Sequence, residues 1–85
     1  GFKVFPNPTH SIIHLEAQLR DNIGDLHVEV FGDTGQVVYR STFPHAAGLW
    51  QHQLDLKKLR LIPGQYIVRL SNGISAEERK VVFTQ

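Results

Sequence analysis

Hydrophobic and polar residues alternate along most of this chain, with a period of two residues. In residues 12–19 every second side chain from Ile13 to Leu19 is apolar, and residues 26–30 repeat the pattern with Leu26, Val28 and Val30. A period of two is typical of a β-strand that buries one face and exposes the other. The same reasoning predicts further strands over residues 3–5, 36–43, 50–55, 65–70 and 80–83.

Turn-forming residues separate these predicted strands. Residues 32–35 (Gly-Asp-Thr-Gly) include glycines that can adopt a positive φ, so residues 26–43 are predicted to form a β-hairpin. Residues 44–48 are a predicted loop, and residues 71–73 a second hairpin turn. Residues 57–62 fit either one helical turn or an irregular crossover between sheets. About seven short strands at regular spacing predict an all-β fold, an immunoglobulin-like β-sandwich without a long helix.

The composition indicates one small domain. The chain has 85 residues, no cysteine and a formal net charge of +1, from 9 basic and 8 acidic residues. This balance argues against binding to nucleic acid, and no apolar run is long enough for insertion into a membrane. Small secreted proteins often carry disulfides, and the sequence starts without a signal peptide. We therefore interpret residues 1–85 as a single module of a longer secreted protein, and expect a monomer or a weak dimer.

The chemically active residues predict neither catalysis nor a metal site. His10 and His14 are four residues apart, which on a strand separates them by about 13 Å, too far for one ion. His45 and His52 flank the predicted loop and have no carboxylate cluster beside them. The serines lack the context of a nucleophile elbow. Three aspartates fall in predicted turns without the spacing of a calcium loop, namely Asp21, Asp25 and Asp33. We expect no enzyme activity, no metal and no cofactor.

Three short motifs follow one another along the chain. Phe5-Pro6-Asn7-Pro8 ends the first predicted strand, because each proline fixes φ and removes a backbone donor. Gly64-Gln65-Tyr66 begins a later strand, and Lys80-Val81-Val82 lies in the last one. With the hairpin turn at Gly35, this ordered set resembles the C-terminal sorting domain family of the type IX (Por) secretion system of Bacteroidetes. The resemblance covers nearly the whole chain.

The resemblance implies a non-catalytic secretion signal. In such a system the parent protein reaches the periplasm, and the outer-membrane translocon recognises the folded sorting domain. A sortase-like cysteine protease then usually removes the domain, and the cargo is secreted or stays at the cell surface. On this basis the predicted recognition residues are Pro6, Asn7, Pro8 and Lys80, and the fold-defining residues are Gly35, Gly64 and Tyr66.

Each motif also has an interpretation that needs no partner. Residues 6–8 fit a strand-breaking corner, and Gly64 fits a position that requires special backbone geometry. Tyr66 fits a core tyrosine whose hydroxyl bonds the backbone, as in the tyrosine corner of immunoglobulin-like sandwiches. Lys80 fits an edge strand on which charge hinders aggregation.

A second function stays open at this point. The chain could be a fibronectin-III-like or carbohydrate-binding accessory module of a cell-surface enzyme, or a spacer domain. An exposed aromatic platform around Trp50 would favour the accessory module. A lone tryptophan on an alternating strand is more often a core residue, so we expect Trp50 to be buried.

Overall fold

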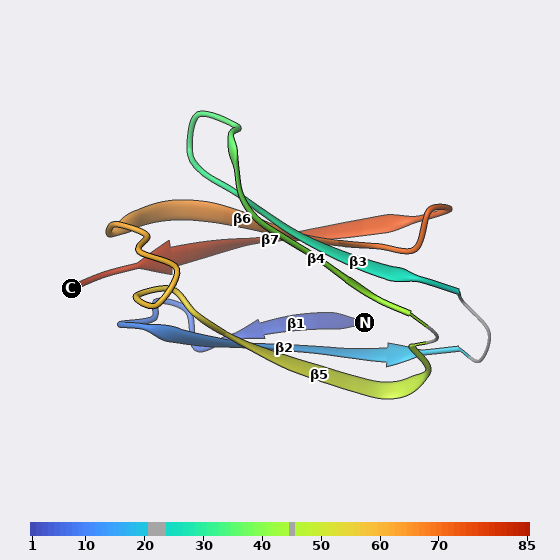
Figure 1. Ribbon diagram of the computed structural model, residues 1–85. Coiled ribbons are helices and arrows are strands. Elements are labelled where there is room, and N and C mark those ends of the chain that lie inside the picture. Colours follow the sequence, from blue (N-terminus) through green and yellow to red (C-terminus); the bar gives the residue numbers. More distant parts are fainter. Residues whose placement is uncertain (21–23, 45) are drawn as a thin grey trace.

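Seven strands in two antiparallel sheets make up the fold (Figure 1). The computed structural model describes residues 1–20, 24–44 and 46–85. One sheet has the strand order β1-β2-β5, and the other has the order β4-β3-β6-β7. The strands are β1 (Phe2–Phe5), β2 (Ile12–Leu19), β3 (Leu26–Phe31), β4 (Val37–Phe43), β5 (Gly48–Asp55), β6 (Gly64–Ser71) and β7 (Ala76–Phe83). The sequence-based prediction of a seven-stranded β-sandwich is confirmed.

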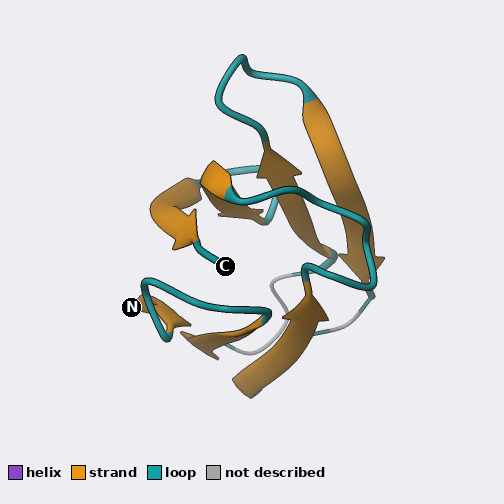
Figure 2. Ribbon diagram, turned by 90° about the vertical axis from the view of Figure 1, so that its left-hand side faces the viewer, coloured by secondary structure: helices purple, strands orange, loops and turns teal. Residues whose placement is uncertain are grey.

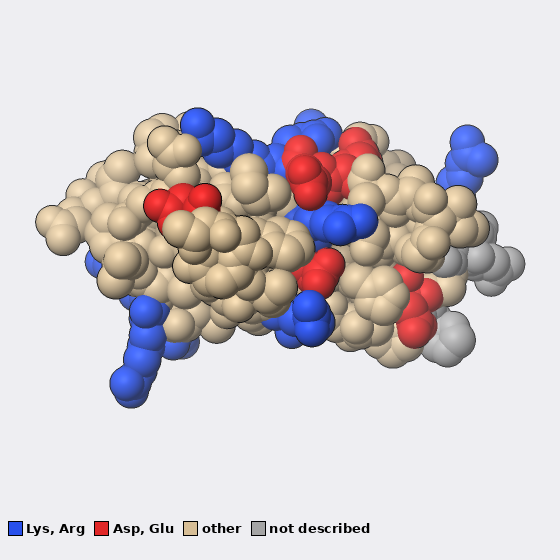
Figure 3. All heavy atoms as spheres, turned by 90° about the horizontal axis from the view of Figure 1, so that it is seen from above, with Lys and Arg blue, Asp and Glu red and all other residues tan. Residues whose placement is uncertain are grey.

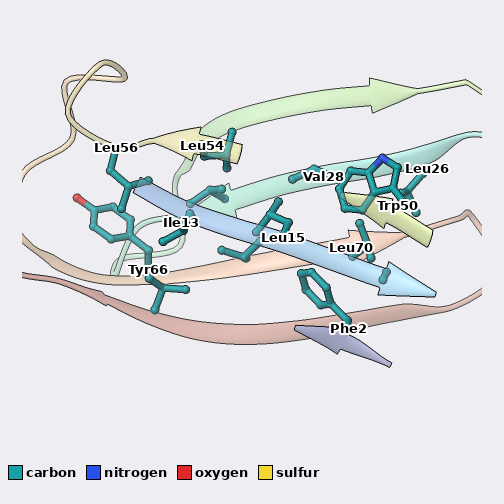
Figure 4. Packing of buried hydrophobic residues seen from close by; sticks show 14 of the residues in the cluster. Phe2, Ile13, Leu15, Leu26, Val28, Trp50, Leu54, Leu56, Tyr66 and Leu70 are labelled. Carbon is teal, nitrogen blue, oxygen red and sulfur yellow. The ribbon is translucent and has the colours of Figure 1, made fainter. Parts of the chain in front are cut away.

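The core lies between the two sheets, as the alternating pattern predicts. Ile13, Leu15 and Ala17 of β2 are buried, and from the other sheet Val28 and Val68 are fully buried. Figure 4 shows the buried side chains converging between the two layers of strands. Because the polar residues of each strand take the opposite face, the apolar period of two is explained by this single shared core.

The position of β4 distinguishes this sandwich from the immunoglobulin constant arrangement. In that arrangement the fourth strand joins the sheet of the first, second and fifth strands. Here β4 pairs with β3 instead. The cause is the tight turn between them, in which the Gly32 N–H donates to the Gln36 oxygen at 2.8 Å and the Gly35 N–H to the Gly32 oxygen at 3.0 Å. This turn confirms the predicted hairpin and keeps β4 beside β3.

Residues 56–62 connect the two sheets and combine the two predicted forms. The Leu59 N–H donates to the Asp55 oxygen at 3.1 Å, as in one helical turn, and the Leu61 N–H returns to the Leu56 oxygen at 3.0 Å. Leu56 is buried and anchors the turn in the core. The segment is therefore an irregular crossover that contains a single turn, and it leads from β5 to β6 in the other sheet.

The last strand is longer than predicted. It begins at Ala76 instead of Lys80, and its first half is exposed. This half lies at the edge of the four-stranded sheet, where it needs few apolar side chains. The hydrophobic alternation that reveals a strand in the sequence therefore appears only at its end, in Val81 and Phe83.

The two motif glycines differ in their backbone conformation. Gly35 has a φ of 88°, in the left-handed region that favours glycine. Gly64 is not among the glycines with positive φ, and the nearest atom to an added Cβ there is the Ile62 oxygen at 4.0 Å. The structure thus supports a backbone role for Gly35 and gives no such reason for Gly64.

Candidate interaction site where residues 6–9 meet the last strand

The segment after β1 crosses to the outer edge of β7. β1 ends at Phe5, where the prolines interrupt pairing as predicted, and the Phe5–Pro6 and Asn7–Pro8 peptide bonds are both cis. The Asn7 side chain then pairs with the β7 backbone: its Nδ2 donates to the Lys80 oxygen at 2.8 Å, and the Val82 N–H donates to its Oδ1 at 2.9 Å. The side-chain amide thus takes the place of a neighbouring strand.

Thr9 continues this pairing with its backbone. Its N–H donates to the Val82 oxygen at 2.9 Å, and the Thr84 N–H donates to the Thr9 oxygen at 2.9 Å. Thr9 is 2% exposed, and its hydroxyl donates to the Ile12 oxygen at 2.6 Å. Thr9 therefore joins the end of β7 through its backbone and the start of β2 through its buried hydroxyl.

The side chain of Arg79 on β7 contacts Phe2 on β1. Its Nε donates to the Phe2 oxygen at 3.1 Å, and its guanidinium lies 5.5 Å from the centre of the Phe2 ring. A second nitrogen, Nη1, donates to the Glu78 oxygen at 2.8 Å. These contacts join the edges of the two sheets on this side of the molecule, where β1 and β7 lie in different layers (Figure 2). We call residues 6–9 together with residues 79–84 the terminal junction.

The predicted recognition residues meet at the terminal junction. Pro6, Asn7 and Pro8 are exposed, and so is Lys80 on the edge strand. The bond from Asn7 to Lys80 joins residues that are 73 positions apart in the sequence. Sequence reasoning proposed both motifs but not their contact. A signal for it was present, because Asn7 carries the only side-chain hydrogen-bonding groups between two prolines that themselves lack an N–H.

Tyr66 lies near the start of β6, just after the crossover, and has a structural role. Its ring is buried, and its hydroxyl donates to the backbone oxygen of Ile62. The predicted tyrosine corner is therefore present at the start of β6.

Two groups outside residues 6–9 and 79–84 have shifted pKa values. Burial lowers the pKa of His52, because the charged imidazolium loses contact with water. A hydrogen bond from Ser11 Oγ, at 2.8 Å, lowers the pKa of Asp55, and the backbone N–H groups of Lys57 and Lys58 add to this effect. His52 makes none of the hydrogen bonds of the terminal junction, whereas Asp55 is linked to the junction through Ser11, whose N–H donates to the Thr9 hydroxyl at 3.2 Å.

The described residues do not bring together three or more His, Cys, Asp or Glu side chains that could hold a metal ion. His10 lies 3.2 Å from the Thr84 hydroxyl, measured from Nδ1 to Oγ1, and Asp25 and Asp33 are exposed. Asp21 and His45 lie outside the described residues. In the part of the chain that is described, no helix is long and apolar enough to cross a membrane.

Trp50 is buried, with 9% of its surface exposed. Its ring meets the ring of Phe43 edge to face, with 5.2 Å between their centres. The expectation of a core tryptophan is confirmed, and Trp50 provides no exposed platform for a sugar.

The fold and the terminal junction define the class of protein, which is a small β-sandwich module. Its exposed features are strand edges and turns. The sequence matches the family described as the secretion system C-terminal sorting domain over residues 3–84, and the chain belongs to this family. It therefore carries a type IX secretion sorting signal, which directs export of its cargo to the cell surface or the medium through the secretion system. No curated protein matches the chain.

Proposed function

We propose that the outer-membrane translocon of the type IX system recognises this domain in its folded state, after the parent protein has reached the periplasm. The observation that carries the proposal is the pairing of Asn7 with Lys80 and Val82. This pairing makes one surface from two motifs at distant sequence positions, and that surface exists only in the folded chain. Recognition through an exposed edge is a common way for a β-fold to meet a partner.

Membership of the family supports a proposal for the later steps. We infer that residues 1–85 are the last module of a longer secreted protein in a member of the Bacteroidetes. A sortase-like cysteine protease then removes the domain, and the cargo is released or retained at the cell surface. The domain itself contributes recognition and no catalysis, as a monomer or weak dimer, and the balanced charge supports a protein partner instead of nucleic acid.

The alternative of a fibronectin-III-like or carbohydrate-binding accessory module loses its main support. An exposed aromatic platform around Trp50 would favour that alternative, and Trp50 is packed against Phe43 and His52 in the core.

Lys80→Ala tests the recognition surface without disturbing the fold. The side chain of Lys80 is exposed, so we expect the free energy of unfolding to change by less than about 0.5 kcal/mol. Export of a fused reporter should nevertheless fall, because the substitution removes a positive charge beside the hydrogen bond between Asn7 and the Lys80 backbone. Lys57→Ala is the matched control, since Lys57 is also exposed but lies on the crossover.

Melting curves and surface delivery are measured for both variants. Equal export of wild type, Lys80→Ala and Lys57→Ala would show that Lys80 only protects the edge strand. The recognition surface would then have to be sought elsewhere on the domain.

A further inference from the structure

The outer edge of β4 is open. In the four-stranded sheet β4 pairs with β3 on one side, and no described strand pairs with its other side (Figure 2). Natural edge strands are usually short, carry lysine or proline, or are covered by other segments. β4 has seven residues, mostly β-formers, and contains neither lysine nor proline.

Two of the other three edges of the sandwich, those of β1 and β7, are protected. β7 is covered by Asn7 and Thr9, and β1 has four residues, includes Lys3 and ends just before Pro6. β4 therefore differs from both edges at the terminal junction in offering an uncovered backbone.

A groove lies beside β4, between the two sheets. It has a volume of about 440 Å³ and runs between β4 and β5. Tyr39 of β4 and His52 of β5 line it together with the apolar residues Ile12, Leu54 and Leu59. The polar residues Gln53, Asp55 and Lys58 complete the lining. In a strand added to β4, every second side chain would point toward the core side and thus into this groove.

The outer face of the four-stranded sheet carries a row of charges of alternating sign. The register aligns Arg40 with Glu29, Glu29 with Arg69 and Arg69 with Glu78. Figure 3, which looks onto this side of the molecule, shows basic and acidic side chains interleaved over its middle. The row ends at the β4 edge with Arg40, which bonds Glu29 at 3.0 Å and is 65% exposed. A strand added beside β4 would therefore favour an acidic residue at the position opposite Arg40.

The β5 edge of the other sheet does not offer the same charge complementarity. Its corresponding row runs from Lys3 to Glu16 to Gln51 and ends on a neutral side chain at β5. A charged partner strand therefore has a reason to choose β4 over β5.

We propose that β4 binds an extended segment of a partner protein by strand addition. The segment places a glutamate or aspartate beside Arg40 on the outer face and a neighbouring apolar side chain in the groove lined by Tyr39 and His52. Backbone hydrogen bonds to β4 supply affinity, and the groove and Arg40 supply selectivity. The site is separate from the terminal junction, so its failure would leave the proposed function standing.

A second copy of this chain is a poorer occupant. Antiparallel pairing of β4 with itself over all seven residues would centre on residue 40 and place two arginines opposite each other. Like charges directly opposite each other destabilise a strand pair.

The test uses two blocked nine-residue peptides with the 85-residue chain. In one peptide valine alternates with glutamate, and in the other valine alternates with lysine. Binding is followed by amide chemical-shift changes in NMR titrations. We expect the glutamate peptide to bind about five-fold more tightly than the lysine peptide, with shifts concentrated on β4 and on the groove residues His52 and Leu59.

Charge reversal sharpens the test. Arg40→Glu should reverse the order of the two peptides, and Arg40→Gln should bring their affinities together. Lys3→Glu changes the net charge as much as Arg40→Glu but lies on β1 in the other sheet, so it should leave the order unchanged. If Arg40→Glu fails to fold, wild type and Arg40→Gln still decide the question.

Three results would overturn the proposal: shifts centred on β7 or β5, no saturable binding at millimolar peptide, or a dimer through β4 in sedimentation experiments. The last result would assign the edge to self-association instead.

Discussion

Tyr66 links the local sequence to the shape of the whole sandwich. Its ring fills part of the core where β6 begins, and its hydroxyl holds the Ile62 oxygen at the end of the crossover. One residue therefore contributes both apolar burial and a partner for a backbone oxygen in a turn. Its identity as a tyrosine corner was predictable from the sequence, because the Gly-x-Tyr motif and the following alternation place it at the start of an inward-facing strand.

Two substitutions separate the two contributions of Tyr66. Tyr66→Phe keeps the ring and removes the hydroxyl, so we expect a loss of about 1 kcal/mol in the free energy of unfolding. Tyr66→Ala also opens a cavity and should cost about 3–5 kcal/mol, a large share of the stability of so small a domain. Urea denaturation measures both values. Similar losses for the two variants would contradict the packing role of the ring.

Gly35 and Gly64 form a matched pair at the residue scale. Gly35→Ala forces an L-residue into the left-handed region and should cost about 1–2 kcal/mol. Gly64→Ala meets no such barrier and has room for its Cβ, so we expect a change within about 0.5 kcal/mol. Thermal melting of the two variants checks this difference. A larger loss for Gly64→Ala would mean that the motif glycine has a structural role that its geometry does not reveal.

At the scale of elements, different chemistry connects the two sheets on the two sides of the sandwich. Hydrogen bonds from Asn7, Thr9 and Arg79 connect them on the side of β1 and β7. Aromatic contacts connect them on the side of β4 and β5, beside the groove, where the Phe43 ring centre lies 4.7 Å from that of His52. The Tyr39 hydroxyl lies 3.4 Å from the same imidazole, at Nε2.

The aromatic side makes stability depend on pH. Because burial lowers the pKa of His52 below its ordinary value of 6.5, the unfolded chain binds a proton more readily than the folded one. The contribution of His52 is therefore fully present above pH 6.5. It should fall as the pH drops from 6.5 through the lower pKa of the folded state, and become constant below it.

His52→Gln isolates this effect, since glutamine does not titrate. Urea denaturation of wild type and variant from pH 8 to pH 5 should show a steeper decline for the wild type in this window. Parallel declines would show that His52 does not couple protonation to folding.

The elements that the sequence predicted best are those with one fully buried face. Residues 12–19 and 26–30 reveal their strands because every second side chain enters the core. The start of β7 was missed because an edge strand can be polar over half its length. The bridge from Asn7 to β7 was also missed, since a contact over 73 residues leaves no periodic trace.

At the scale of the whole molecule, two local features decide the topology. The tight turn at residues 32–35 keeps β4 beside β3, and the crossover at residues 56–62 sends the chain to the other sheet. The strand count, the sandwich and the pairing of β4 with β3 followed from periodicity and turn chemistry, whereas the order of the other strands within the two sheets did not. The terminal junction then places the family's first and last motifs on one surface.

The central claim is that this folded surface is a sorting signal read by the type IX secretion system. The most direct measurement is the surface delivery of a periplasmic reporter fused to residues 1–85, in a bacterium with a working type IX system and in a strain that lacks the translocon. We predict delivery in the first strain and none in the second, with Tyr66→Ala abolishing delivery because the domain unfolds. A reporter that stays in the periplasm of the working strain, while an established sorting domain exports the same reporter, would contradict the claim.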